Sequence, residues 1–138
     1  MTGSEAEPAV PEAPDPEEEF QRLCRQLRRT AKSQRDKAVV QALTEERTIL
    51  ELPAVRRALI VDTSRGAKVS MEALSGRQYG LGLDEQQLSF LGLILSMFGI
   101  GITTLAAVQD LDDRRLPIIL RAILRLAGNE DIAVGRRL

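Results

Sequence analysis

The chain has 138 residues, the size of one domain with a tail, and its charge is nearly balanced, with 19 basic and 20 acidic side chains. It has no histidine and one cysteine, so it lacks the commonest general base and cannot form an internal disulfide or a thiolate zinc site. The glycine-rich phosphate loop, the dinucleotide-binding glycine pattern and the nucleophile elbow are also missing from the sequence. These features predict a protein that is not an enzyme and uses no cofactor or metal. The lone cysteine and the lack of a signal-like start favour the cytoplasm.

The first predicted segment, residues 1–16, is a disordered acidic tail. It contains four prolines, Pro8, Pro11, Pro14 and Pro16. Such closely spaced prolines prevent a helix, and the segment has little apolar surface to bury. Residues 1–19 hold seven acids and no base. We expect a solubilising tail; the functional alternative is an acidic segment that attracts a basic partner or competes for the basic helix behind it.

Residues 17–52 are predicted to form a basic amphipathic helical arm. Apolar side chains recur at helical spacing from Phe20 to Ala31, and the opposite face is basic. Residues 20–37 contain seven bases and one acid. The candidate contacts for phosphates, anionic lipid or an acidic partner are Arg22, Arg25, Arg28, Arg29 and Lys32. The alternative, a basic face that is merely solvated, stays open.

Residues 53–83 are predicted to be a connector that contains one short β-hairpin. Pro53 ends the arm because the residue before a proline avoids helical angles. Residues 55–61 fit either a short helix or a strand. Residues 63–66 have the composition of a turn, so residues 67–70 are expected to return as the second strand.

Residues 84–128 are predicted to be a C-terminal helical core organised around residues 88–108, which hold no charged side chain. A helix of about 20 apolar residues is long enough to cross a membrane. On an unbroken helix, small residues would share one face, as in packed membrane helices. They are Gly92, Ser96, Gly99 and Thr103. A membrane location through residues 88–108 is therefore one interpretation.

The other interpretation, which we favour, is a buried pair of shorter helices. Gly99 and Gly101 lie near the middle of the apolar stretch, and glycine both weakens a helix interior and readily closes a helix end. The first helix is expected to begin after an N-cap at Asp84 and to end near Phe98. The second is expected to begin at Thr103 or Thr104 and to stop before Asp112.

A last helix is predicted between the acidic pair Asp112 and Asp113 and the terminating pair Gly128 and Asn129, with residues 129–138 as a tail. Its wide apolar face is the candidate interface, formed by Leu116, Ile119, Leu120, Ile123 and Leu124. The opposite face carries Arg114, Arg121 and Arg125. Such a helix must pack on the core or on another chain. Its apolar spacing is similar to that of the last helix of SAM-like interaction domains.

Residues 98–105, Phe-Gly-Ile-Gly-Ile-Thr-Thr-Leu, resemble the hairpin of helix-hairpin-helix modules. In that family a Gly-hydrophobic-Gly turn presents backbone N–H groups to a nucleic-acid phosphate. The resemblance implies that Gly99, Gly101 and Thr103 are phosphate contacts. Phe98 stands where the family usually has proline. Residues 78–113 also lack the lysines and arginines that supply most of the affinity for a polyanion.

Together these patterns predict a mostly α-helical fold, a small helical bundle with a disordered N-terminal tail and one short β-hairpin. The predicted function is that of a non-enzymatic protein–protein interaction or regulatory module. The apolar helical surface exceeds what a few short helices can hide, so we expect a homo-oligomer or a protein partner. The alternatives are a nucleic-acid-binding protein that uses the basic arm and the glycine turn, and a single-pass membrane protein that spans residues 88–108.

Overall fold

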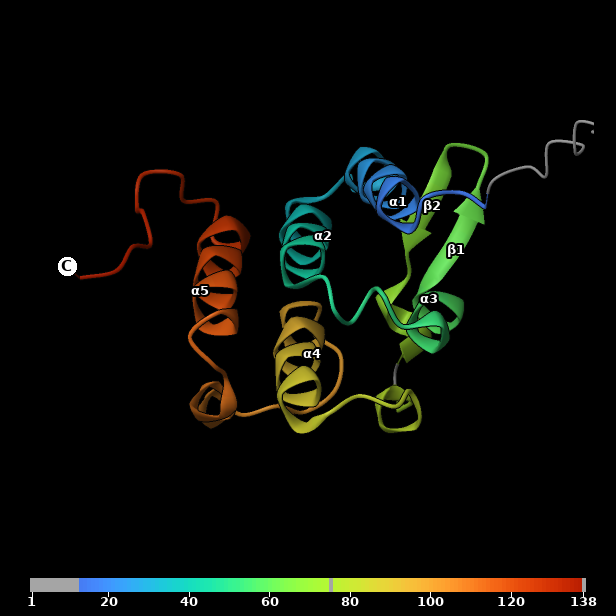
Figure 1. The fold of residues 1–138 in the computed structure, drawn as a ribbon. Coiled ribbons are helices and arrows are strands. Elements are labelled where there is room, and N and C mark those ends of the chain that lie inside the picture. Colours follow the sequence, from blue (N-terminus) through green and yellow to red (C-terminus); the bar gives the residue numbers. More distant parts are fainter. Residues whose placement is uncertain (1–12, 75, 138) are drawn as a thin grey trace, which may run out of the picture.

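A computed structural model describes residues 13–74 and 76–137, and it is mostly helical with one short antiparallel hairpin, as predicted (Figure 1). The elements are α1 (Pro16–Thr30), α2 (Gln34–Glu46), α3 (Pro53–Leu59), β1 (Ile60–Thr63), β2 (Gly66–Val69), η1 (Met71–Leu74), η2 (Gln78–Gly80), α4 (Glu85–Met97), η3 (Leu105–Asp110) and α5 (Arg115–Leu126). The three η segments are 3₁₀ helices. Most of the predicted acidic tail, residues 1–12, lies outside the described residues.

The predicted helical segment 17–52 contains two helices in place of a continuous arm. α1 begins at Pro16, where proline is tolerated, and the Asp15 carboxylate accepts a hydrogen bond from the Glu17 backbone. Ser33 and Asp36 then form a reciprocal capping box that starts α2. The chain therefore turns between Thr30 and Ser33.

The ambiguous stretch 55–61 divides between a helix and a strand. It completes α3 as far as Leu59 and continues directly into β1, which pairs with β2 in a register that sets Ile60 opposite Val69. The hairpin packs against α1 (Figure 1). Thr30 donates a hydrogen bond from its hydroxyl to the Ala67 carbonyl at 2.8 Å, and this contact fixes the hairpin beside the helix.

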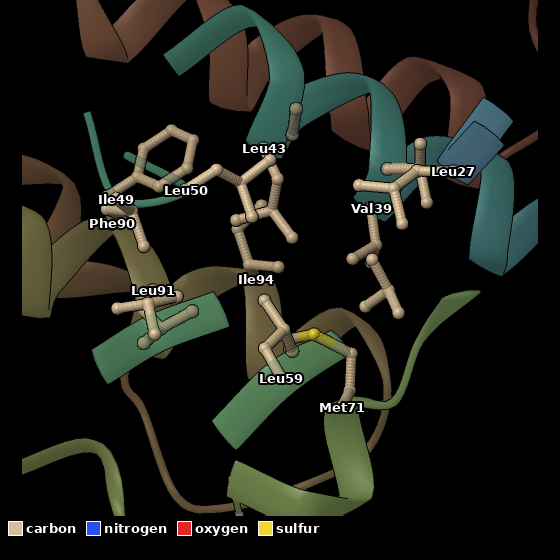
Figure 2. Packing of buried hydrophobic residues seen from close by; sticks show 14 of the residues in the cluster. Leu27, Val39, Leu43, Ile49, Leu50, Leu59, Met71, Phe90, Leu91 and Ile94 are labelled. Carbon is tan, nitrogen blue, oxygen red and sulfur yellow. The ribbon is translucent and has the colours of Figure 1, made fainter. Parts of the chain in front are cut away.

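A single apolar cluster fills the space between the helices (Figure 2). α4 contributes Phe90, Leu91, Leu93, Ile94 and Leu95, all buried. The other elements cover α4 with Leu27, Val39, Leu43, Leu59, Met71, Ile118 and Ile119. Residues of the basic segment 17–52 and of the segment 84–128 therefore belong to the same core.

The apolar stretch ends its helix at the predicted glycine pair. Asp84 caps α4 in a capping box with Gln87, and the helix closes with Phe98 as C-cap. Gly99 and Gly101 both have φ of 75°, and the Ile100 N–H donates to the Leu95 carbonyl, as in a Schellman motif. Within the described residues, no helix is long and apolar enough to cross a membrane. The unbroken helix over residues 88–108 that the membrane alternative requires is not formed.

The second half of the apolar stretch differs from the prediction. An α-helix was expected from Thr103 or Thr104, but the chain forms the 3₁₀ helix η3, and none of its residues is buried. Ile102 is 99% exposed and Leu105 is 73% exposed. Six residues are too few to sustain an isolated α-helix, and the Thr104 side chain makes no cap. The buried half of the stretch is therefore α4 alone.

The glycine turn yields the first testable prediction. Gly101→Ala is expected to lower the free energy of unfolding by about 1 kcal/mol or more, because an L-residue is strained at positive φ. An added Cβ would meet no atom within 4 Å at this position, so the loss reports backbone strain alone. Urea denaturation followed by circular dichroism measures it.

Gly80→Ala is the matched control. It also has open space around the added Cβ, but its φ lies outside the left-handed region. Its stability is expected to stay the same or to rise by up to about 1 kcal/mol. Equal destabilisation by both substitutions would contradict the assigned turn.

Candidate functional site

The most elaborate polar cluster surrounds the fully buried side chain of Glu46, at the C-terminal end of α2. One carboxylate oxygen accepts a hydrogen bond from the Ile49 N–H at 2.8 Å. The other forms ion pairs with Arg115 at 2.9 Å and Arg114 at 3.0 Å, and it also accepts a hydrogen bond from the Thr48 hydroxyl. The negative charge is therefore matched by two guanidinium groups.

Arg115 connects this cluster to two further segments. Its side chain is only 10% exposed, and it pairs with Asp112 at 2.8 Å and donates to the Gln86 side chain at 3.2 Å. Gln87 of α4 donates to Thr48 at 3.1 Å. The cluster thus ties the end of α2 to the beginnings of α4 and α5. We call Glu46, Thr48, Gln87, Arg114 and Arg115 the polar clasp.

Sequence reasoning missed the polar clasp, although a signal was present. Glu46 follows Val39 and Leu43 at helical spacing, so it lies on the buried stripe of α2. Arg115 likewise precedes Ile118 and Ile119 on the buried face of α5. Two opposite charges, each on an apolar stripe, predict a buried ion pair. The polar clasp is a structural tie, because its carboxylate oxygens are already occupied by donors of the same chain.

A second, more exposed set of ion pairs lies beside the polar clasp. Glu45 pairs with Arg121 at 2.9 Å and with Arg125 at 3.5 Å. Burial raises the pKa of Glu45, but hydrogen bonds from Gln41 and Arg121 and the two positive charges outweigh it, so the pKa lies below its usual value. The arginine face predicted for the last helix therefore packs against α2.

The predicted basic contacts form one exposed surface on the outer side of α1. We call it the basic ridge, and it consists of Arg22, Arg25, Arg28, Arg29 and Lys32. The buried side of α1 faces the core through Phe20, Cys24 and Leu27. Burial raises the pKa of the Cys24 thiol, which keeps it protonated at neutral pH.

The glycine turn was predicted to contact phosphate through free backbone N–H groups, but not all of its residues have one. The Gly99 N–H donates to the Ser96 carbonyl, so it serves to end α4. Gly101 is exposed, and the Thr103 side chain lies over Gly92, whose added Cβ would stand 3.0 Å from the Thr103 hydroxyl. The turn is followed by the short η3 and not by the α-helix found in helix-hairpin-helix modules.

The predicted interface on α5 is divided between the core and the surface. Ile119 is buried, so it belongs to the core and is not available to a partner. Leu116 and Leu124 are half-buried, while Leu120 is 41% exposed and Ile123 is 40% exposed. An uncovered apolar stripe remains, which we define as Leu116, Leu120, Ile123 and Ala127 and call the α5 stripe.

A groove of about 810 Å³ separates the start of α2 from the end of α5 and residues 128–134. Lys32, Lys37, Arg121 and Arg125 line it together with apolar side chains of Leu124, Ile132 and Val134. No set of three cysteine, aspartate or glutamate side chains in residues 13–74 and 76–137 is arranged to hold a metal ion. The distinctive surfaces are thus the basic ridge, the α5 stripe and this groove.

The polar clasp yields the second prediction. Glu46→Gln removes the negative charge that pairs with Arg114 and Arg115. We expect the free energy of unfolding to fall by about 3 kcal/mol or more. Glu51→Gln is the control, because Glu51 forms an exposed pair with Arg47 whose loss should cost less than about 1 kcal/mol. Denaturant unfolding of both variants distinguishes the two sites. Equal effects would show that the clasp is not the stronger tie.

The lowered pKa of Glu45 yields the third prediction, on acid stability. A carboxyl group with a depressed pKa in the folded state contributes stability above its unfolded pKa, near 4.5, and loses that contribution as pH falls further. Glu45→Gln is therefore less stable than the wild type at pH 6.5, and the difference should shrink toward pH 3. Glu72→Gln, an exposed carboxyl on η1, should show no such convergence.

Comparisons of the chain with protein-family models, with characterised proteins and with solved structures found no match.

Proposed function

We propose that the protein is a non-enzymatic helical interaction module that binds a second copy of itself through the α5 stripe. The observation that carries this proposal is an apolar stripe left uncovered on a helix whose other side is fully packed. α5 lies at one edge of the helical array, with α2 and α4 as its packing neighbours (Figure 1). Its outer side is therefore accessible to another chain.

The spacing of the α5 stripe favours a second helix as the occupant. Its four residues follow at intervals of four, three and four, which is the spacing of a seam between two helices. A second copy offers the same stripe, so a twofold arrangement buries both at once. The arginines of α5 are engaged with α2 through Glu45 and Glu46, which leaves the stripe itself without charge.

The chemistry of the chain supports an interaction role over catalysis. The sequence has no histidine, and the single thiol, Cys24, is buried among apolar side chains. The buried charges of the polar clasp already form hydrogen bonds within the chain, so they are not free to act on a substrate. α5 has 12 residues, so a contact between two copies of this helix is smaller than a standard protein interface. We therefore expect a weak, concentration-dependent dimer.

The fourth prediction tests this dimer. Wild-type protein should increase in mean mass between about 1 µM and about 1 mM in analytical ultracentrifugation, as expected for a weak association. The double variant Leu120→Glu and Ile123→Glu should remain monomeric, because it places two charges in an apolar seam.

Leu105→Glu is the matched control, since Leu105 is an exposed leucine on η3 outside the α5 stripe. It should dimerise like the wild type. Circular dichroism of all variants checks that the fold is retained. A wild-type chain that stays monomeric at the highest concentration would rule out the proposed dimer, and loss of association in Leu105→Glu would place the contact elsewhere.

A further inference from the structure

The basic ridge takes no part in the proposed dimer. Within the described residues, no ion pair involves Arg22, Arg25, Arg28, Arg29 or Lys32. The chain does pair its other arginines where they hold the fold together, as at Arg47, Arg115 and Arg121. Glu19 and Asp62 line one groove with Arg22, but the five positive charges of the ridge outnumber these two acids and repel one another in the free protein. A negatively charged partner would relieve that repulsion.

The tip of the β-hairpin lies against the basic ridge. The Arg29 guanidinium donates to the Arg65 carbonyl at 3.0 Å, so the hairpin tip lies against the ridge. Gly66 makes this approach possible, because an added Cβ would stand 2.9 Å from the Arg29 side chain. Arg65 and Lys68 are both exposed. The hairpin thus holds the Arg29 side chain of the ridge in place.

The composition of this surface identifies the kind of partner. The apolar side of α1 is buried in the core, so the helix has no apolar face to insert into a bilayer. None of the large apolar side chains exposed in the described part of the chain lies on α1, whereas protein interfaces usually have apolar or aromatic anchors. The aromatic content is 3%, too low for the stacking surfaces that bind single strands.

The backbone of a nucleic-acid duplex is a negatively charged partner that needs neither apolar anchors nor stacking aromatic side chains. It offers two rows of phosphates, and arginine binds phosphate with paired, planar hydrogen bonds. Arg22, Arg25 and Arg29 are spaced by three and four residues, so their Cα atoms extend over roughly 10 Å of one helix side. We propose that the basic ridge binds the phosphate backbone of duplex nucleic acid without reading its sequence.

The fifth prediction tests this surface with the full chain and a fluorescent DNA duplex of about 20 base pairs. We expect affinity to fall steeply between about 50 and 200 mM salt, with a slope of about −4 or −5 in a plot of log K against log salt. Arg25→Ala should weaken binding about tenfold and reduce the slope by about 1. A second duplex of unrelated sequence should bind within about threefold of the first.

Arg77→Ala is the matched control, because Arg77 is also an exposed arginine without an ion pair in the described residues, but it is the N-cap of η2 and belongs neither to α1 nor to the hairpin. It should leave the affinity and the slope unchanged. The triple variant Glu5→Gln, Glu7→Gln and Glu12→Gln removes three carboxylates that precede α1 in the sequence, so it makes the net charge of the chain more positive by three. Its affinity should equal or exceed that of the wild type.

Three outcomes would overturn the proposal. The first is no duplex binding at low salt by either the wild type or the triple variant. The second is tighter binding to a single strand, or to vesicles that contain anionic lipid, than to the duplex. The third is an equal loss of affinity in Arg25→Ala and Arg77→Ala, which would indicate a response to net charge alone. The double variant Leu120→Glu and Ile123→Glu keeps the basic ridge intact. Duplex binding by this variant therefore tests the ridge independently of the dimer.

Discussion

The constraint on which the fold depends is the burial of α4, a helix with no charge between Glu85 and Met97 and with apolar side chains on most of its circumference. Such a helix cannot lie at the surface with only one side covered. α2, α3, α5 and the segment η1 each place apolar side chains against it or against one another in a single cluster (Figure 2). α2, α5, η2 and η3 contact α4 directly, and α3 packs on η1 beside them.

Apolar contacts alone would leave α5 free to shift along its neighbours, because leucine and isoleucine pack in several registers. The polar clasp removes that freedom. Arg115 reaches Glu46, Asp112 and Gln86 only when α5 begins beside the end of α2 and the start of α4. Burying these charges costs desolvation energy that their attraction only partly offsets, so their main effect is to select one arrangement. The position of the α5 stripe on the outer side of the molecule is a consequence of that selection.

Local signals in the sequence predicted the elements better than the contacts between them. The cap at Asp84, the turn at residues 63–66 and the glycine end of α4 depend on neighbouring residues, and they were predicted. The cap at Ser33, which starts α2, is equally local but was not predicted. The division of the α5 face, with Ile119 inside and Ile123 outside, depends on which side meets α2 and α4, and periodicity cannot decide that. Periodicity does place Glu46 and Arg115 on buried stripes, but it cannot show that these two residues, 69 apart in the sequence, meet each other. Conversely, residues 102–110 are apolar enough for a buried helix, but Ile102 and Leu105 are exposed and only Ala107 and Val108 pack against the core, as half-buried residues.

The distribution of charge also separates the two proposed surfaces. α2 contacts both α1 and α5, so it lies between the basic ridge and the α5 stripe (Figure 1). Its glutamates, Glu45 and Glu46, neutralise the arginines of α5, while the cations of α1 face outward without such partners. A dimer formed through the α5 stripe would leave both basic ridges uncovered. Two ridges on one particle would then bind a long polyanion more tightly than either alone, because the second contact becomes intramolecular. Weak self-association and weak, salt-sensitive binding would therefore reinforce each other.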